Sequence, residues 1–325
     1  MRRRNFITLL GAAAAWPVMA PAQQRPMPVI GILNMQTENS EVTRQAAYRR
    51  GLEEAGFVEG RNVTIENRFA DGENERLPML AAELIRRPVA VLMANTTPPA
   101  IAAKAATATI PIVFLTGVDP VKFGLVASLN RPGANVTGVT FLVNQVVSKR
   151  LELLCDVVPK ARPVGMLADG NNLNAEPDIK EALNAAAALG RSLLVEKVTG
   201  PSDIDTAIST LVQKGAAALF IAPNANFRIW HHQVLALAAR HSLPTSFSTG
   251  DLVSAGALMS YGPDQLDSYR QAGMLTGRIL KGEKPAELPV MQATKFDFVL
   301  NLKTAKALGI TISPTMLALA TAVIE

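Results

Sequence analysis

From residue 28 onward, the chain alternates short apolar runs with amphipathic segments. Runs such as PVIGILN, VAVLMAN and IPIVFLTG alternate with segments of helical periodicity, for example residues 42–54 and 77–86. Several runs are continuously apolar, as strands buried on both faces of a parallel sheet must be. The alternation predicts a doubly wound α/β fold.

The pattern is long enough for two passes of the same scheme. The expected strands are residues 28–34, 62–69, 89–95, 110–117, 135–141, 163–169, 192–198, 217–224, 243–250, 256–262 and 295–301. The second pass begins near residue 162, after an expected helix in VVSKRLELLCDVV. Further helices are expected over 179–188, 203–214 and 227–241. Two α/β lobes create a cleft, and ligands of open parallel sheets lie beyond the carboxyl ends of the strands.

The amino-terminal segment has the form of an export signal. Residues 1–22 combine three arginines, an apolar stretch and small residues near the end. The apolar stretch is too short for a membrane-spanning helix, which needs about 20 residues. Pro21 disfavours cleavage after Ala20, so cleavage is expected after Ala22. Both an ordinary secretory signal and a twin-arginine signal fit, and either predicts a periplasmic protein without a membrane-spanning segment.

Charge and cysteine content exclude several classes of protein. Removal of residues 1–22 lowers the formal net charge from +5 to +2. No basic stripe with interleaved aromatic residues follows, so no nucleic-acid partner is predicted. Cys155 is the only cysteine, which excludes an intramolecular disulfide and a multi-cysteine metal site. We expect Cys155 near a helix end, as a small buried hydrophobic residue.

Amide and hydroxyl side chains collect at the ends of the expected strands. They are Asn34, Asn95, Thr96, Thr97, Thr116, Thr140, Asn171, Asn172, Asn174, Asn224, Asn226, Ser246 and Ser248, with Asp119 as the acid. Uncharged hydrogen-bonding groups of this kind suit a polar or zwitterionic small molecule. The same residue types are also ordinary turn and cap residues, so both interpretations stay open for each one.

Two of these strand ends precede proline. In ANTTPPAIAAKAA, Thr96 or Thr97 is expected to cap a helix whose free N–H groups and dipole attract a carboxylate. Asp119, before Pro120, is expected to cap a helix that runs to Ser128. At the cleft, this carboxylate would also bind a ligand ammonium. Capping alone explains both patterns equally well.

Motifs for catalysis and cofactor binding are missing from the sequence. It has no G-x-S-x-G elbow, no phosphate loop and no G-x-G-x-x-G after a strand. Adjacent His231 and His232 do not have the i,i+4 spacing that a metal pair on a helix needs. No catalytic residue, metal or cofactor is predicted.

Four stretches resemble the substrate-binding proteins of ABC transporters that are related to the tryptophan-binding component. They are IPIVFLTGVDPVKFGLVASLNRPGANVTGV, YRRGLEEAGFVEGRNVTIENRFADG, ALAARHSLPT and GRILKGEKPAELPVMQATKFDFVLNLKTAKALGI. The resemblance covers essentially the whole chain after the export signal. It implies an α/β protein of type I periplasmic-binding-protein architecture, with two Rossmann-like lobes of parallel sheet that close on a ligand. It further implies a monomer that serves an ABC permease in the inner membrane, with a separate ATPase subunit.

The resemblance also implies a lobe assignment. The first lobe would comprise residues 23–143 and about 262–290, and the second about 144–261 and 291–325. In tryptophan-type members, a threonine motif and an aspartate face the ligand, and these correspond here to Thr96–Thr97 and Asp119, with Thr140 after the N-V-T-G turn.

The second lobe departs from the pattern of amino-acid binders. Asn224 stands where an acidic residue is expected, and Arg228 nearby is a candidate partner for a ligand anion. An amino acid and a small aromatic or other carboxylate therefore both remain possible ligands.

Two other functions fit the same architecture. An exported α/β enzyme would act on a small substrate in the cleft, and a sensory module would present its ligand-bound lobes to a membrane receptor. Turnover of a bound ligand would distinguish the enzyme.

We expect the exported protein to begin at Gln23. Intact-mass measurement of protein from the native compartment checks the cleavage, with the full-length chain as the reference mass. An uncleaved chain confined to the cytosol would contradict both the export signal and the transport hypothesis.

Overall fold

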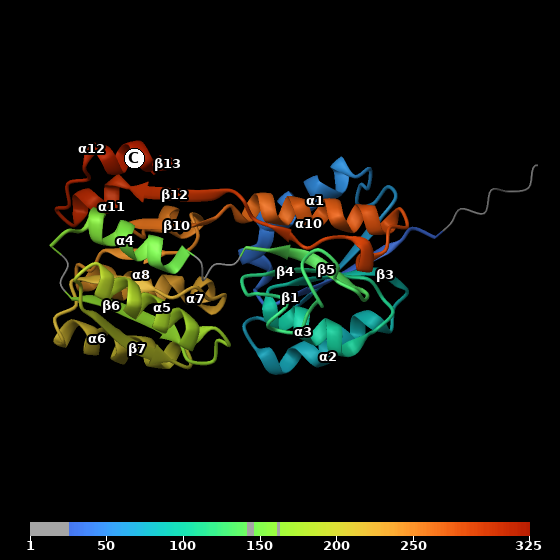
Figure 1. The fold of residues 1–325 in the computed structure, drawn as a ribbon, viewed down its shortest axis with the longest axis horizontal. Helices are drawn as coiled ribbons and strands as arrows, with labels where there is room; N and C mark the ends of the chain where they lie inside the picture. The colour runs from blue at the N-terminus through green and yellow to red at the C-terminus, as the bar shows by residue number, and fades with distance from the viewer. Residues whose placement is uncertain (1–25, 142–145, 161–162) are drawn as a thin grey trace, which may run out of the picture.

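The computed structural model describes residues 26–141, 146–160 and 163–325. The expected export signal and its cleavage site lie outside these residues. Figure 1 shows two lobes side by side, each with a sheet between helices. Among the described residues, no helix combines the length and the apolar character needed to cross a bilayer.

The first sheet is parallel throughout and has the order β11-β5-β4-β3-β1-β2. Its strands are β1 (Val29–Asn34), β2 (Thr64–Phe69), β3 (Val89–Asn95), β4 (Ile112–Thr116), β5 (Val136–Thr140) and β11 (Met291–Gln292). Helices α1 (Glu38–Glu54) and α10 (Gln265–Leu280) cover one face, and α2 (Leu77–Ile85) and α3 (Thr97–Ala106) cover the other. β3 and β4 are almost wholly buried, as their continuous apolar sequences predict.

The second sheet has the order β13-β12-β10-β9-β8-β6-β7, and only its β10–β12 pair is antiparallel. Its strands are β6 (Val164–Asp169), β7 (Leu193–Val198), β8 (Ala218–Ile221), β9 (Thr245–Phe247), β10 (Met259–Pro263), β12 (Phe296–Asn301) and β13 (Ala322–Ile324). Its helices are α4 (Val147–Val157), α5 (Ala175–Ala188), α6 (Ile204–Gln213), α7 (Asn226–Ile229), α8 (His231–Arg240), α9 (Asp251–Ser254), α11 (Leu302–Ala307) and α12 (Pro314–Leu319).

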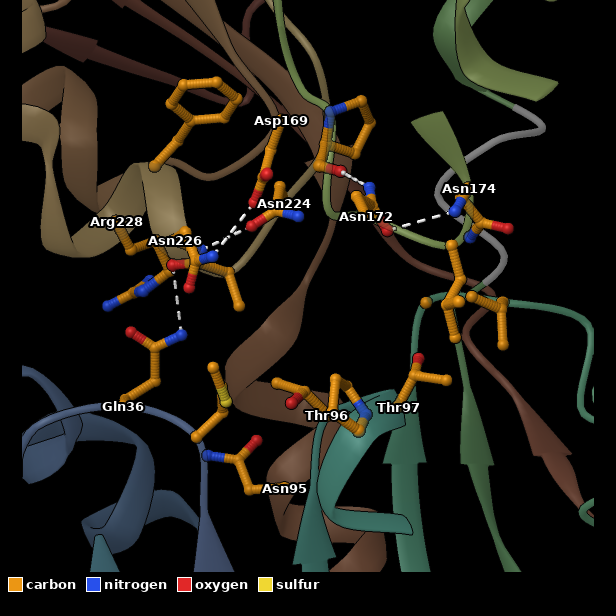
Figure 2. Close-up of a pocket in the computed structure, with 18 of the residues that line it drawn as sticks. Gln36, Asn95, Thr96, Thr97, Asp169, Asn172, Asn174, Asn224, Asn226 and Arg228 are labelled. Carbon is orange, nitrogen blue, oxygen red and sulfur yellow. Dashed lines mark hydrogen bonds between the residues drawn. The ribbon is translucent and has the colours of Figure 1, made fainter. Parts of the chain in front are cut away.

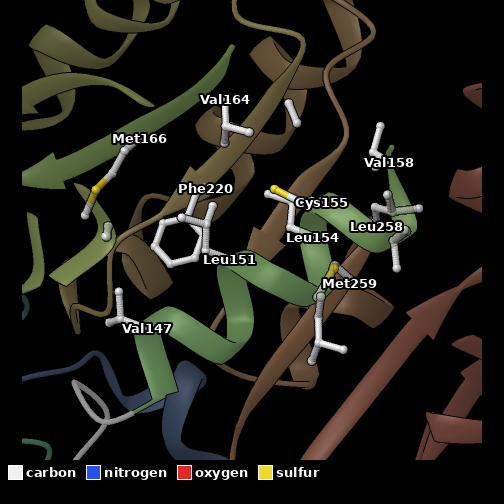
Figure 3. Close-up of a cluster of buried hydrophobic side chains, with 14 of the residues drawn as sticks. Val147, Leu151, Leu154, Cys155, Val158, Val164, Met166, Phe220, Leu258 and Met259 are labelled. Carbon is white, nitrogen blue, oxygen red and sulfur yellow. The ribbon is translucent and has the colours of Figure 1, made fainter. Parts of the chain in front are cut away.

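Cys155 lies on α4 in the core of the second lobe. It is buried with Leu151, Leu154 and Val164 in a cluster that includes Phe220 of β8 (Figure 3). Burial raises the pKa of its thiol, which disfavours the reactive thiolate. The expected role as a small buried hydrophobic residue agrees with this environment.

The chain passes between the two sheets more than once. After β10 in the second sheet, α10 returns to pack along α1 in the first lobe, and β12 lies in the second sheet. β11 at Met291–Gln292 still pairs with β5 of the first sheet, so the chain leaves that sheet slightly beyond the expected boundary at residue 290.

Two expected helices differ from the structure. The segment after Asp119 forms turns instead of a helix to Ser128, because Gly124 adopts φ 65° and Leu125 N–H bonds back to the Pro120 carbonyl at 2.8 Å. The expected helix over 227–241 is divided at Trp230 into α7 and α8.

Glycines bring α1 and α10 into direct backbone contact. A methyl group built on Gly273 would lie 2.2 Å from the Tyr48 carbonyl oxygen, and one on Gly51 would lie 1.9 Å from the Arg270 carbonyl oxygen. No side chain fits at either position unless the helices separate. This contact holds α10 on the first lobe, although α10 lies in the last quarter of the sequence.

Gly273→Ala is therefore expected to lower the free energy of unfolding by about 1–3 kcal/mol, as overpacking does. In an exposed helix the same change would stabilise by about 1 kcal/mol. Urea denaturation measures the difference, and Thr43→Ala on the exposed side of α1 is the control, with an expected change within about 0.5 kcal/mol. A stabilised Gly273→Ala protein would contradict the close helix contact.

Candidate ligand-binding site

A cavity of about 510 Å³ lies between the two lobes. Residues that follow β1 and β3 line it from the first lobe, and residues at the ends of β6 and β8 line it from the second. Figure 2 shows Thr96 and Thr97 facing Asp169 and Asn224 across this space. The cavity is within the size range of small-molecule sites.

The first-lobe side contains a buried carboxylate that is fully partnered. Glu41 is 1% exposed, and its carboxylate accepts from Asn95 Nδ2 at 2.8 Å and from the Tyr269 hydroxyl at 3.0 Å. Asn95 Nδ2 also donates to Asn34 Oδ1 at 3.0 Å. Burial raises the pKa of Glu41, and the positive charge of Arg44 opposes this shift. Asn34 thus belongs to a network beneath the cavity and does not line it.

Thr96 and Thr97 begin α3 at the cavity. Thr96 adopts φ 82°, a strained conformation for a residue with a β-branched side chain. Neither threonine makes the expected cap, since no side chain bonds to a first-turn N–H. Pro98 and Pro99 have no N–H, so Thr97 carries the only backbone donor in the segment 97–99. The amino-terminal end of α3 can therefore attract an anion through the helix dipole, the Thr97 N–H and the Thr96 hydroxyl.

The second-lobe side contains Asp169, a buried carboxylate with neutral partners only. It is 1% exposed, and it accepts from Asn171 N at 2.9 Å and from Asn226 Nδ2 at 2.9 Å. Among the described residues, no cation lies within ion-pair distance of it. Burial raises the pKa of Asp169, and its two hydrogen bonds oppose the shift. Such a group favours a cationic ligand group.

The asparagines near Asp169 connect the segments that follow β6, β7 and β8. Asn172 Nδ2 donates to the Pro223 carbonyl at 3.1 Å, and Asn224 Oδ1 accepts from Asn226 N at 2.5 Å (Figure 2). Asn171 Nδ2 donates to the Thr199 carbonyl at 2.8 Å. The amides therefore shape the second-lobe wall as well as line it.

Four buried oxygens of lining side chains have no hydrogen-bond partner in the part of the chain that the structure describes. They are Gln36 Oε1, Thr96 Oγ1, Asn226 Oδ1 and Thr249 Oγ1. Buried polar groups are normally partnered, and an unpartnered one costs about 1–3 kcal/mol. Their concentration at one cavity favours a polar ligand there.

Apolar side chains complete the cavity. Met35, Leu77, Ile101, Phe141 and Leu173 line it beside the polar groups. A ligand that fits therefore combines charged or polar ends with an apolar body.

The structure brings most of the predicted site residues to one cavity. Those that line it are Thr96, Thr97, Asn171, Asn174, Asn224, Arg228 and Ser248. Asn34, Thr116, Asp119 and Thr140 do not line it, so the geometry of this cavity gives no support to the ligand contact expected for these four.

Thr116 and Thr140 contact residues that line the cavity, whereas Asp119 bonds within its own turn. Thr116 Oγ1 lies 2.7 Å from Thr97 Oγ1, and Thr140 Oγ1 donates to the Val118 carbonyl at 2.9 Å. Asp119 Oδ1 accepts from Val121 N at 2.9 Å and from Lys122 N at 3.3 Å. Asp119 therefore caps the segment that follows it, as expected, but that segment is a turn and not a helix.

The sequence interpretation missed Asp169. The signal is present, because this acid ends the apolar run PVGMLAD at the carboxyl end of a strand. The acid was expected instead at the end of the predicted strand 217–224, where the sequence has Asn224.

Comparison with known proteins decides the family. Residues 30–324 match the family model of the ABC transporter substrate binding proteins. The chain belongs to this family. Its architecture is that of the type I periplasmic binding proteins, as the resemblance predicted.

Three relatives have informative names. A tyrosine-binding protein of Clostridioides difficile is 29% identical over 281 residues, which cover 86% of this chain and 80% of the relative. An ABC domain from Streptococcus pneumonia in complex with L-Trp superposes with a TM-score of 0.84 at 25% identity, over 92% of this chain and 100% of that chain. The ligand-free, open structure of CD0873 from Clostridium difficile, a substrate binding protein with adhesive properties, gives 0.67 at 25% identity, over 92% and 99%.

Asp169→Asn is expected to stabilise the ligand-free protein at neutral pH by about 0.5–2 kcal/mol, as changes that relieve functional sites do. The folded-state pKa of Asp169 is raised, so its ionisation costs stability as pH rises above the ordinary value of 3.8 through the folded pKa. The amide removes this cost, and rotation of the Asn226 amide restores the hydrogen bond.

Chemical denaturation between pH 4 and pH 8 checks this expectation. The gain should grow with pH and be smallest in acid. A gain that is constant with pH, or a loss at pH 7, would contradict it.

Proposed function

We propose that this protein is the periplasmic solute-binding component of an ABC importer and that it binds a zwitterionic amino acid with an aromatic or large apolar side chain. The ligand lies between the two lobes, and their closure presents it to a permease in the inner membrane. The protein acts as a monomer after export by residues 1–22.

The unpaired carboxylate of Asp169, opposite the amino terminus of α3, carries this proposal. An amino acid has an ammonium and a carboxylate on one carbon atom. Asp169 supplies the negative charge for the ammonium, and Thr96, Thr97 and the dipole of α3 supply the donors for the carboxylate. The two groups come from opposite lobes, so a single zwitterion bridges both.

The apolar lining and the relatives suggest the side chain of the ligand. Met35, Leu77, Ile101 and Phe141 supply an apolar surface beside the polar groups. The names of two relatives give tyrosine and L-Trp as their ligands. We therefore assign the apolar part of the cavity to an aromatic side chain.

Asp169→Asn is expected to weaken binding of L-tyrosine or L-tryptophan by about 1.5–3 kcal/mol, the range for hydrogen bonds to charged groups. The amide keeps the size of the side chain but removes the charge that pairs with the ammonium. Wild-type affinity should also fall as pH drops through the pKa of Asp169, because the neutral acid does not attract the ammonium, whereas the affinity of the variant should stay flat. Isothermal titration calorimetry measures both effects.

Asp119→Asn is the matched control, because it removes the same charge from a residue that does not line the cavity. Its affinity should equal that of the wild type. If Asp119→Asn weakens binding and Asp169→Asn does not, Asp119 is the ammonium partner and the proposed orientation is wrong. Recovery of a chemically altered ligand would support an enzyme instead.

A further inference from the structure

A group of charged residues joins the two lobes beside the cavity. Arg228 of α7, in the second lobe, donates from NH2 to the carbonyl oxygen of Ser40 on α1 at 3.3 Å. Its NH1 lies 2.8 Å from Asp251 Oδ2, at the start of α9. Arg228 therefore contacts both lobes at once.

The same carboxylate oxygen of Asp251 also meets the first lobe. Arg44 of α1 places NH2 at 3.6 Å from Asp251 Oδ2, while two of its nitrogens donate to Gln265 Oε1 at 2.9 and 2.6 Å. Asp251 thus lies between two guanidinium groups, one from each lobe. Like charges on Arg44 and Arg228 would repel each other without it.

A neutral hydrogen bond extends this contact between the lobes. Gln36 Nε2, after β1, donates to the Ala225 carbonyl at 3.1 Å (Figure 2). Ala225 belongs to the loop that follows β8 and immediately precedes α7. The backbone of the loop between β8 and α7, which contains Asn224, is therefore bound to the first lobe.

We propose that Arg228, Asp251 and Arg44 form an electrostatic latch that stabilises the closed lobes, so that Arg228 sets ligand affinity through closure rather than by pairing with a ligand anion. Its NH2 donates to the Ser40 carbonyl and its NH1 forms an ion pair with Asp251, whereas Nε and NH1 make no hydrogen bond with the described residues. Asp251 does not line the cavity. This inference rests on the proposed function, because it concerns how tightly the same site holds its ligand.

The latch acts only when the lobes are together. Contacts made in one conformation alone shift the equilibrium towards it, and a ligand that needs that conformation gains the same factor in affinity. The side chain of Asp251 is 46% exposed and that of Arg228 is 11% exposed. Solvent screening therefore keeps the effect modest, and added salt should reduce it.

A double-mutant cycle distinguishes the latch from a direct ligand contact. Arg228→Gln and Asp251→Asn are each expected to weaken binding of L-tyrosine or L-tryptophan by roughly fivefold. Because both remove the same latch, the double variant should lose little more than either single variant. Independent losses that multiply in the double variant, or an unchanged affinity in Asp251→Asn, would overturn the proposal.

Lys214→Gln is the matched control. It removes a charge pair of similar geometry, Lys214 Nζ to Glu196 at 2.6 Å, that lies wholly within the second lobe. Its affinity should equal that of the wild type at low salt and at 1 M NaCl. The difference between wild type and Arg228→Gln should shrink at 1 M NaCl, and a difference that does not change with salt would contradict an electrostatic latch.

A measurement without ligand separates this proposal from the proposed function. If the wild type binds neither amino acid, the proposed function fails, and small-angle scattering then tests the latch alone. In low salt, ligand-free Arg228→Gln should have a larger radius of gyration than the wild type and than Lys214→Gln. Equal radii for the three proteins would in that case overturn the latch.

Discussion

Parallel pairing of the strands fixes where chemistry can occur in this molecule. It directs the carboxyl ends of β1 and β3 to one edge of the first sheet and those of β6 and β8 to one edge of the second. The residues that follow these strands meet at the cavity between the lobes. The contact between α1 and α10 preserves this geometry, because it holds a helix from the last quarter of the chain on the first lobe.

The two buried carboxylates beside the cavity show how different partners give different roles. Glu41 accepts hydrogen bonds from an asparagine amide and a tyrosine hydroxyl and lies near the positive charge of Arg44. It therefore serves as a structural acceptor. Asp169 has only two neutral donors. Its charge is therefore available to a cationic ligand, at a cost to the stability of the free protein. On the first-lobe side of the cavity, opposite Asp169, the backbone of Thr96 is strained, with φ 82°.

Much of this arrangement could be predicted from the sequence, because buried parallel strands and strand-end polar residues leave strong local patterns. The turn after Asp119 could not, since the Asp-Pro order fits a helix cap and a turn cap equally well and Gly124 decides between them. β11 and β13 were missed because they have two and three residues. For Asn34, Thr116 and Thr140, the strand-end position was visible, but a neighbouring strand or helix determines whether the side chain reaches the cavity.

Arg228 illustrates a second limit of local patterns. Beside a strand end, an arginine suggests a partner for a ligand anion, and its place at the cavity agrees with that interpretation. Its observed contacts are with Asp251 and the Ser40 carbonyl. Both lie far from Arg228 in the sequence, so a local pattern does not reveal them. If these contacts hold the lobes together, recognition and closure depend on different side chains. Affinity can then change through Asp251, which does not line the cavity, while the shape of the cavity and its choice of ligand stay the same.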